Sequence, residues 1–442
     1  MKGKKIIILL LIILFICITS VIILIAHNNN NIKDVSKQKE ELIITGMLHQ
    51  SRNYFGLKKM VEKLKIEENI TIDFQVIPDE QFDTLMQMKI KAGKAPDIID
   101  YNVPRVYGSI DPLEHLADLS NEPWINKLKN IDTLKYTDGK MYSFPLQDNS
   151  GISGIIYNKK LFEKYDIKIP RTSKQFEDVC KYLITQGITP ILMCKENWVP
   201  QMWMNYGYSQ ALGSGEKCEE MSKKILKGEK KFSDYQELAE VIDYYVSMFK
   251  KGYVNNDYLT VTYTDMLKRL TTGEGAMILG YSEMISTIQR VDRTADIGIF
   301  NPPFDYNKND LLVCPRFSIG FVASKDSENL ETVKKVFNLW SKPEYLNLWF
   351  KDNPGFPAFI LVDGGNVNAD VINLYEKYKK QNKIIYESMS YLEPIQPLNS
   401  TILWPYYLEA PKEDITGEEL LSRFQLDLDK YLGKTKKIYD GN

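Results

Sequence analysis

The chain has 442 residues, of which 44% are hydrophobic and 26% are charged, with a mean hydropathy of −0.30; this is the composition of a globular protein of two or three domains and excludes a disordered or collagen-like chain. The 56 basic and 58 acidic residues leave a net charge of −2, which gives no electrostatic basis for binding nucleic acid. With 3 histidines and 5 cysteines, we expect neither a histidine-rich metal site nor a disulfide scaffold.

A basic N-terminus precedes an apolar stretch at residues 6–26, which only Thr19 and Ser20 interrupt. Lysines ahead of such a stretch are typical of an export signal or a membrane anchor. A helix rising about 1.5 Å per residue would be long enough here to cross a hydrocarbon core of roughly 30 Å. We therefore expect residues 1–27 to be a signal peptide or a transmembrane anchor helix, residues 28–40 to be a polar linker, and the rest to lie outside the membrane.

Two interpretations of the apolar segment remain open, an uncleaved anchor and a lipoprotein. Residues 25–27 make a poor small-residue cleavage site, which favours an uncleaved anchor. A lipoprotein anchored through Cys17 is the alternative, although the bulky Ile16 precedes this cysteine and apolar residues follow it. A mass spectrum of the mature N-terminus distinguishes the two.

From residue 41 onward, short runs rich in β-branched residues alternate with helical patterns. The runs predict strands at 42–47, 71–77, 97–100, 153–158, 189–194, 275–280, 296–300 and 317–324. Apolar stripes at helical spacing predict helices through 57–64, 176–183, 330–340 and 421–432. Ser51 is expected to cap the first helix, and Thr172 or Ser173 the second. This alternation indicates mainly parallel sheets, and the length favours two lobes between which the chain crosses more than once.

The most informative stretch is residues 139–183, with the sequence GKMYSFPLQDNSGISGIIYNKKLFEKYDIKIPRTSKQFEDVCKYL. It closely resembles the bacterial extracellular solute-binding proteins of ABC transporters, in the family that includes maltose- and oligosaccharide-binding proteins. Further segments match in order, namely AGKAPDIIDYN (92–102), GEGAMILGYSE (273–283), DIGIFNPP (296–303), GFVASKDSENLETVKKVFNLWSKPEYLNLWF (320–350) and GFPA (355–358). Together, behind an export segment, they extend over nearly all of the mature chain.

The resemblance implies an α/β fold of the two-lobed periplasmic-binding-protein type (type II), with hinge crossings and a central cleft that closes on its ligand. The expected lobes are 41–150 plus 300–345 for the N-terminal lobe, and 151–299 plus 346–442 for the C-terminal lobe. The crossings are expected near 146–150, 299–303 and 343–351.

The function that the resemblance implies is capture of a carbohydrate, either a sugar or an oligosaccharide, and its delivery to ABC transporter permease subunits. We expect a monomer attached to the membrane by its N-terminal segment, with no cofactor, metal or catalytic residue. Two other functions stay open, a membrane-tethered sugar sensor for a signalling receptor and a binder of a non-sugar solute. A secreted glycosidase is less favoured, because no pair of acids stands out and common catalytic motifs are absent from the sequence.

Sugar binding requires flat aromatic rings for the C–H face and planar polar groups for the hydroxyls. The loop after the 189–194 strand carries Glu196 and Trp198, which match an acid and a stacking aromatic in the family, and Trp203 follows them. The resemblance also implies cleft positions for Tyr281 and Trp404. Core packing is the structural alternative for each ring.

Polar candidates follow the strand ends and the first hinge, where ligands of open α/β sheets bind. They are Asp100, Asn102, Asp148, Asn149 and His49. Turn formation is the alternative role for the aspartates and asparagines, and a surface or helix-start position is the alternative for His49.

The cysteines of the globular part are expected to be buried thiols. Cys180 lies on an apolar helix face and Cys194 at a strand end. A disulfide between these two residues is the alternative outside the cell.

Overall fold

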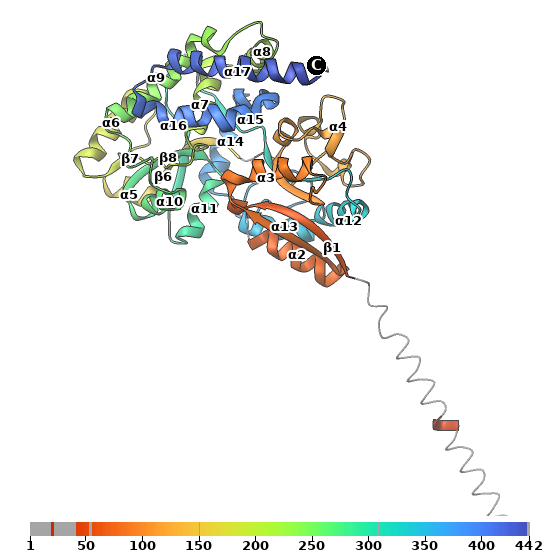
Figure 1. The fold of residues 1–442 in the computed structure, drawn as a ribbon. Coiled ribbons are helices and arrows are strands. Elements are labelled where there is room, and N and C mark those ends of the chain that lie inside the picture. The colour runs from red at the N-terminus through yellow and green to blue at the C-terminus, as the bar shows by residue number, and fades with distance from the viewer. Residues whose placement is uncertain (1–18, 22–40, 53–54, 150, 307–308, 440–442) are drawn as a thin grey trace, which may run out of the picture.

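The computed structural model describes residues 19–21, 41–52, 55–149, 151–306 and 309–439. Most of the predicted anchor, with Cys17, and the predicted linker at 28–40 lie outside these residues. Within the described part of the chain, no helix combines the length and the apolar character needed to cross a membrane. The globular part consists of two α/β lobes, each built on its own sheet and hydrophobic core (Figure 1).

The N-terminal lobe contains a five-stranded sheet with the order β2-β1-β3-β11-β4. The first strand, β1 (Leu42–His49), pairs in parallel with β2 (Ile70–Ile77) and β3 (Ile98–Val103). The late strand β11 (Ser318–Ala323) returns antiparallel between β3 and β4 (Phe144–Pro145). A strand from far along the sequence thus completes this lobe.

In the described part of this lobe, helices cover the sheet. They are α2 (Phe55–Glu68), α3 (Asp79–Lys91), α12 (Leu330–Trp340) and α13 (Pro343–Asp352), and the short α4 (Pro112–His115) lies beside them. The predicted stripe of α2 is confirmed, because Leu57, Met60 and Leu64 are buried. The predicted cap is wrong, because Ser51 belongs to the 3-10 turn Gln50–Arg52.

The C-terminal lobe contains a four-stranded sheet with the order β7-β8-β6-β9. Only β7 (Thr189–Ile191) and β8 (Gly275–Tyr281) pair in parallel. The strand β6 (Ser153–Asn158) is antiparallel to β8 and to β9 (Ile297–Phe300). The expectation of mainly parallel pairing is therefore wrong for this lobe, because buried strands carry the same apolar signal in either direction.

Many helices surround this second sheet. They are α5 (Lys159–Lys164), α6 (Ser173–Thr185), α7 (Pro200–Leu212), α8 (Gly215–Leu226), α9 (Gln236–Lys250), α10 (Tyr263–Thr272), α11 (Met284–Val291), α14 (Ala369–Lys380), α15 (Gln396–Leu398), α16 (Trp404–Glu413) and α17 (Gly417–Tyr439). Thr172 caps α6, as predicted, by accepting from the Gln175 amide. Every residue of α7 is buried, because α9 and α16 pack against it.

Two small sheets join distant segments. In the first, β5 (Gln147–Asn149) pairs antiparallel with β12 (Phe356–Pro357) where the chain passes between the lobes. In the second, β10 (Leu312–Cys314) pairs in parallel with β13 (Ile384–Tyr386).

The chain changes hydrophobic core at three places along the sequence. Core membership changes after Leu146, after Phe317 and after Phe359. The first change agrees with the predicted crossing near 146–150. The predicted second and third crossings are too early, because residues 300–317 still pack in the C-terminal lobe, whereas α13 and Phe359 pack in the N-terminal lobe.

Candidate functional site

A cavity of about 250 Å³ lies between the two lobes. The N-terminal lobe contributes wall residues at the ends of β1 and β3 and in the turns and helices that follow β1, β2 and β3, namely His49, Ser51, Arg52, Asp79, Asp83, Tyr101, Asn102 and Arg105. The C-terminal lobe contributes a more aromatic wall, which includes Trp198, Gln201, Met202, Tyr263, Tyr281, Glu283, Gln396 and Trp404. A molecule in this cavity therefore contacts both lobes at once.

The N-terminal wall is organised around Asp100, which is fully buried on β3 beneath the cavity. Its carboxylate accepts from the His49 backbone amide at 3.1 Å and from Arg52 Nη1 at 3.1 Å, and it lies 2.8 Å from His49 Nδ1. Arg52 also donates to the Asn102 side chain. Burial opposes ionisation of Asp100, but the charge of Arg52 and the contacts with His49 hold its pKa below the usual range.

This network fixes the polar groups that face the cavity. The His49 ring is held from one side by Asp100 and lies on Phe82, with ring centroids 3.5 Å apart and planes inclined by 13°. Asp83 accepts a hydrogen bond of 2.7 Å from the hydroxyl of Tyr101. Imidazole, guanidinium, amide and carboxylate groups thus stand in fixed positions, as recognition of hydroxyls requires.

The opposite wall carries two half-buried tryptophans. Trp198 follows β7 and meets the ring of Tyr263 edge-on, with centroids 4.9 Å apart. Trp404 begins α16. Both indole rings line the cavity and retain exposed surface, so they can stack on the apolar face of a ligand.

Behind the aromatic wall lies a buried polar cluster. Asn205 donates to Gln201 at 2.7 Å, to the Tyr281 hydroxyl at 3.3 Å and to Glu387 at 3.1 Å. Burial raises the pKa of Glu387, and burial together with the nearby Glu387 raises the pKa of Tyr281. The cluster orients the groups of the C-terminal wall.

The structure brings five of the predicted site residues to the cavity wall. These residues are Trp198, Tyr281, Trp404, Asn102 and His49. Asp100 lies directly beneath the wall and contacts two of its members, His49 and Arg52. Their roles in ligand binding remain predictions.

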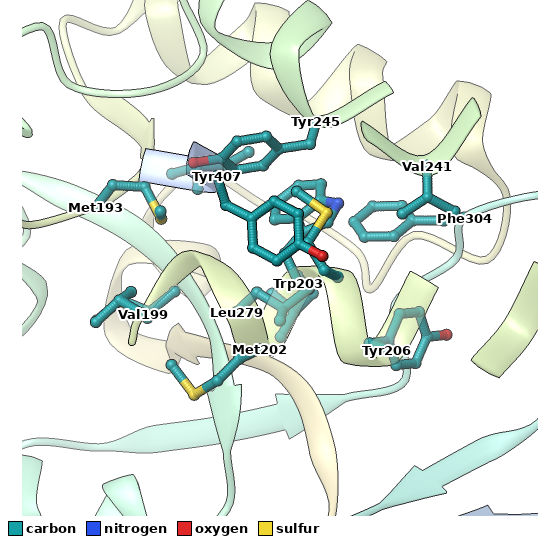
Figure 2. Packing of buried hydrophobic residues seen from close by; sticks show 14 of the residues in the cluster. Met193, Val199, Met202, Trp203, Tyr206, Val241, Tyr245, Leu279, Phe304 and Tyr407 are labelled. Carbon is teal, nitrogen blue, oxygen red and sulfur yellow. The ribbon is translucent and has the colours of Figure 1, made fainter. Parts of the chain in front are cut away.

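The other candidates lie elsewhere. Trp203 is a core residue with 2% of its surface exposed, stacked on Phe304 among the rings and methionines of Figure 2. Glu196 precedes Trp198 without lining the cavity. Asp148 belongs to the crossing strand β5, where it accepts from Asn130 at 2.8 Å and burial raises its pKa. Asn149 is part of the same strand.

Sequence reasoning missed several wall residues, among them Arg52, Asp79, Asp83 and Arg105. Asp79 follows β2 just as His49 ends β1, so the strand-end rule could have found it. Gln396 begins the short helix α15, in a run of short helical turns where no periodicity of the sequence marks a position. A second cavity of about 240 Å³ lies beside the crossing segments, and Glu283 borders both cavities.

The described cysteines are buried free thiols, so the alternative of a Cys180–Cys194 disulfide is wrong. Burial raises the pKa of both thiols, which makes them poor nucleophiles. Among the described residues, no group of His, Cys, Asp and Glu is suited to hold a metal ion.

Comparison with known proteins provides the context of this cavity. The family model described as bacterial extracellular solute-binding protein matches residues 52–346. The melibiose/raffinose/stachyose-binding protein MelE of Bacillus subtilis is 21% identical over 361 residues, which cover 78% of this chain and 79% of MelE. The multiple sugar-binding protein of Streptococcus mutans is 23% identical over 283 residues, which cover 63% of this chain and 66% of that protein.

Solved structures agree on the fold. A chitin oligosaccharide binding protein matches with a TM-score of 0.75 at 20% identity, over 89% of this chain and 100% of that chain. The likeness confirms the predicted two-lobed α/β architecture.

Proposed function

Because the chain belongs to the family of bacterial extracellular solute-binding proteins, we propose that it captures a carbohydrate in the cavity between its lobes. The captured sugar or oligosaccharide is then delivered to the permease subunits of an ABC transporter. The family works outside the cytoplasm, and the apolar N-terminal segment holds this protein at the outer face of the membrane as a monomer.

One observation carries the proposal: the cavity has a stacking wall on one lobe and a hydrogen-bonding wall on the other. Trp198 and Trp404 offer flat apolar faces, whereas His49 and Asn102 offer polar groups fixed by the Asp100 network. A pyranose has both kinds of surface, since its ring hydrogens are apolar and its hydroxyls donate and accept. The named sugars of the relatives are consistent with this chemistry.

The division of the wall between two lobes also supplies a mechanism. A ligand that contacts both lobes binds the closed form more tightly than the open form, and it shifts the equilibrium toward closure by that difference in affinity. The crossing segments after Leu146, Phe317 and Phe359 are the places where the backbone can bend. Closure requires no bond to be made or broken, so binding leaves the sugar intact.

The test is a calorimetric screen of the purified extracytoplasmic part against melibiose, raffinose, stachyose, chitotetraose and xylotetraose, with tryptophan emission as a second signal. We expect saturable binding of at least one sugar and its recovery unchanged by chromatography. Cleavage of the sugar would instead identify a glycosidase. Binding of none of these sugars would reject the proposal.

The partner is tested separately, because a sugar sensor would use the same cavity. Crosslinking in membranes of the source cell should recover permease subunits with the sugar-loaded protein. Recovery of a histidine kinase instead would identify the sensor.

A further inference from the structure

Arg105 stands out in the cavity wall because it is a largely buried cation that donates no hydrogen bond to any residue the structure describes. It begins the 3-10 helix Arg105–Gly108 that follows β3, and only 6% of its surface is exposed. Its guanidinium lies 4.0 Å from the ring centroid of Phe317, in a cation–π contact. Between this guanidinium and the described residues, no hydrogen bond is found, yet the residue lines the cavity.

The donors of Arg105 reach the cavity, because its nitrogen atoms are not among the fully enclosed ones that lack a hydrogen bond. A guanidinium has five N–H donors along its edge, and it keeps its charge in proteins. The ring of Phe317 covers a flat face of the group and leaves the edge donors unused. The donors are therefore available to acceptor atoms of a molecule in the cavity.

The other arginine of the wall differs in this respect. Arg52 donates to Asp100 and to Asn102, so its fork already has partners within the N-terminal lobe. The charge of Arg105 acts at longer range on Glu387, Tyr101 and Tyr281, without a hydrogen bond to any of them. The two arginines thus separate into one that supports the wall and one that faces the ligand.

We propose, resting on the proposed function, that Arg105 determines specificity by donating its fork to two adjacent hydroxyls of a neutral sugar. Two neighbouring equatorial hydroxyl oxygens present a pair of acceptors to the parallel N–H bonds of a guanidinium. The ring of Phe317 holds the plane of the group, so the direction of these donors is set before the ligand arrives. Such fixed donors favour one arrangement of adjacent hydroxyls over its epimers.

The charges of the wall argue for a neutral rather than an acidic sugar. The carboxylates of Asp79, Asp83 and Glu283 line the cavity, against the cations of Arg52 and Arg105. The carboxylate of Asp100 adds a further negative charge directly beneath. A uronic acid would bring another anion into this surplus of negative charge, and like charges at short range repel.

The experiment compares raffinose, a neutral trisaccharide, with trigalacturonate, an acidic one, by calorimetry on the extracytoplasmic part. If the screen above finds another neutral sugar that binds more tightly, that sugar replaces raffinose. We expect the neutral sugar to bind at least about tenfold more tightly than trigalacturonate, since a like-charge contact at this range amounts to one or more factors of ten in affinity. This comparison needs no variant, so it does not depend on any variant folding.

Two substitutions then test the residue itself. R105K keeps the charge and loses the planar fork, and R105Q loses the charge. We expect both substitutions to lower the affinity for the neutral sugar by about tenfold or more, because charge-assisted hydrogen bonds are lost. R269K is the matched control, because Arg269 is held by Asp257 outside the cavity. The sugar affinity of this variant should stay within about twofold of that of the parent.

The outcomes separate the possibilities. If R105K and R105Q lower the melting temperature but bind the neutral sugar as tightly as the parent, Arg105 is structural and the inference is wrong, while the proposed function stands. If trigalacturonate binds more tightly than any neutral sugar, the assignment to neutral ligands is overturned. If neither class binds to the parent protein, the proposed function and this inference fail together.

Discussion

Two tryptophans on either side of the start of α7 have opposite environments. Trp203 is packed in the core, with its ring centroid 4.9 Å from that of Phe304 and the planes inclined by 19° (Figure 2). Trp198 lies in the preceding loop, is half-buried and lines the cavity between the lobes. The sequence places both in one aromatic segment, and only the surroundings distinguish them. A ring with free surface beside fixed polar groups is available to a ligand, whereas an enclosed ring stabilises the fold.

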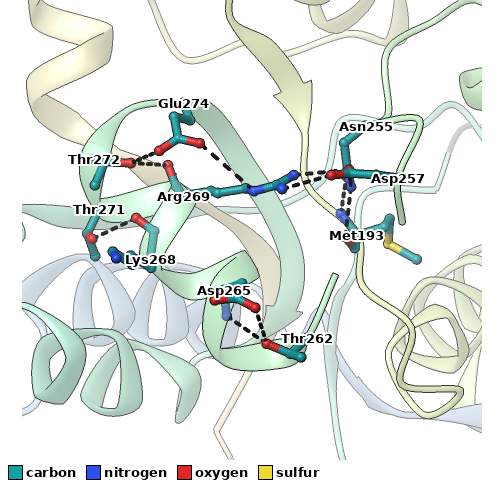
Figure 3. A network of polar contacts seen from close by, with 10 residues as sticks. All are labelled: Met193, Asn255, Asp257, Thr262, Asp265, Lys268, Arg269, Thr271, Thr272 and Glu274. Atoms are coloured by element: carbon teal, nitrogen blue, oxygen red, sulfur yellow. Dashed lines mark hydrogen bonds and ion pairs between the residues drawn. The ribbon is translucent and has the colours of Figure 1, made fainter. Parts of the chain in front are cut away.

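Two arginines differ in the same way. Arg269 donates to both oxygens of Asp257, at 3.0 and 2.7 Å, in the network of Figure 3, and that network closes on itself through Thr272 and Glu274. Arg105 has no comparable partner among the described residues and faces the cavity. Arg269 therefore supports the fold, whereas the donors of Arg105 are directed to the cavity.

The largest effect on stability is expected for Trp203→Ala, which removes the ring packed in the core. Removal of a fully buried indole should lower the free energy of unfolding by about 3–5 kcal/mol. Urea denaturation followed by circular dichroism measures it. A loss of less than about 1 kcal/mol would show that the ring is not part of the core.

A similar but somewhat smaller loss is expected for Asp100→Leu, on the cavity side. This change leaves Arg52 and His49 without their buried partner and should cost roughly 3 kcal/mol of stability. It should also weaken sugar binding, because His49 and Arg52 lose their fixed positions. Asp100→Asn is the more specific test, because it keeps the shape of the side chain and removes only its charge. Unchanged sugar affinity in both variants would show that the Asp100 network does not contribute to sugar binding.

The complementary change is Trp198→Ala. Loss of a stacking ring should weaken sugar binding by about 1–3 kcal/mol while the unfolding free energy changes little, because the ring is half-buried. Calorimetric titration beside urea denaturation separates the two quantities. If affinity is unchanged and stability falls as in Trp203→Ala, the distinction between the two rings is wrong.

The smallest effect is expected at the Arg269 network and depends on pH. Hydrogen bonds from Arg269 lower the pKa of Asp257 to about 2. Because the folded-state pKa lies below the unfolded value of about 3.9, the stabilisation is fully present above pH 4 and is lost as the pH falls toward 2. Its size is limited because the carboxylate is 45% exposed.

Melting temperatures of the parent and of Asp257→Asn test this prediction. The parent should be the more stable at pH 6, and the difference should shrink below pH 4. A difference that is independent of pH would mean that the ion pair does not contribute.

Much of the fold could be predicted from the sequence. The eight predicted strands all occur, because buried β-branched runs bounded by turn residues have a strong local signal. The direction of β6 and the later two crossings could not be predicted, since they depend on pairing between distant segments such as β10 and β13.

The candidate site could be predicted from the sequence only in part. Trp198 follows a strand and His49 ends one, where local rules apply, and both residues line the cavity. Arg105 was missed because a single arginine after a strand has no local signature, and its burial against Phe317 is a tertiary contact. Trp203 could not be assigned to the core from the sequence, because its burial depends on packing against Phe304 and helix α9.

The central claim is that one sugar is held between two lobes, and paired titrations test it most directly. The sugar found in the screen is titrated into the parent, into Trp198→Ala from the C-terminal lobe and into Asn102→Ala from the N-terminal lobe. The account predicts one site per chain in the parent, and weaker binding in both variants with their melting temperatures nearly unchanged. Binding that only one lobe's variant weakens, or that neither weakens, would contradict it.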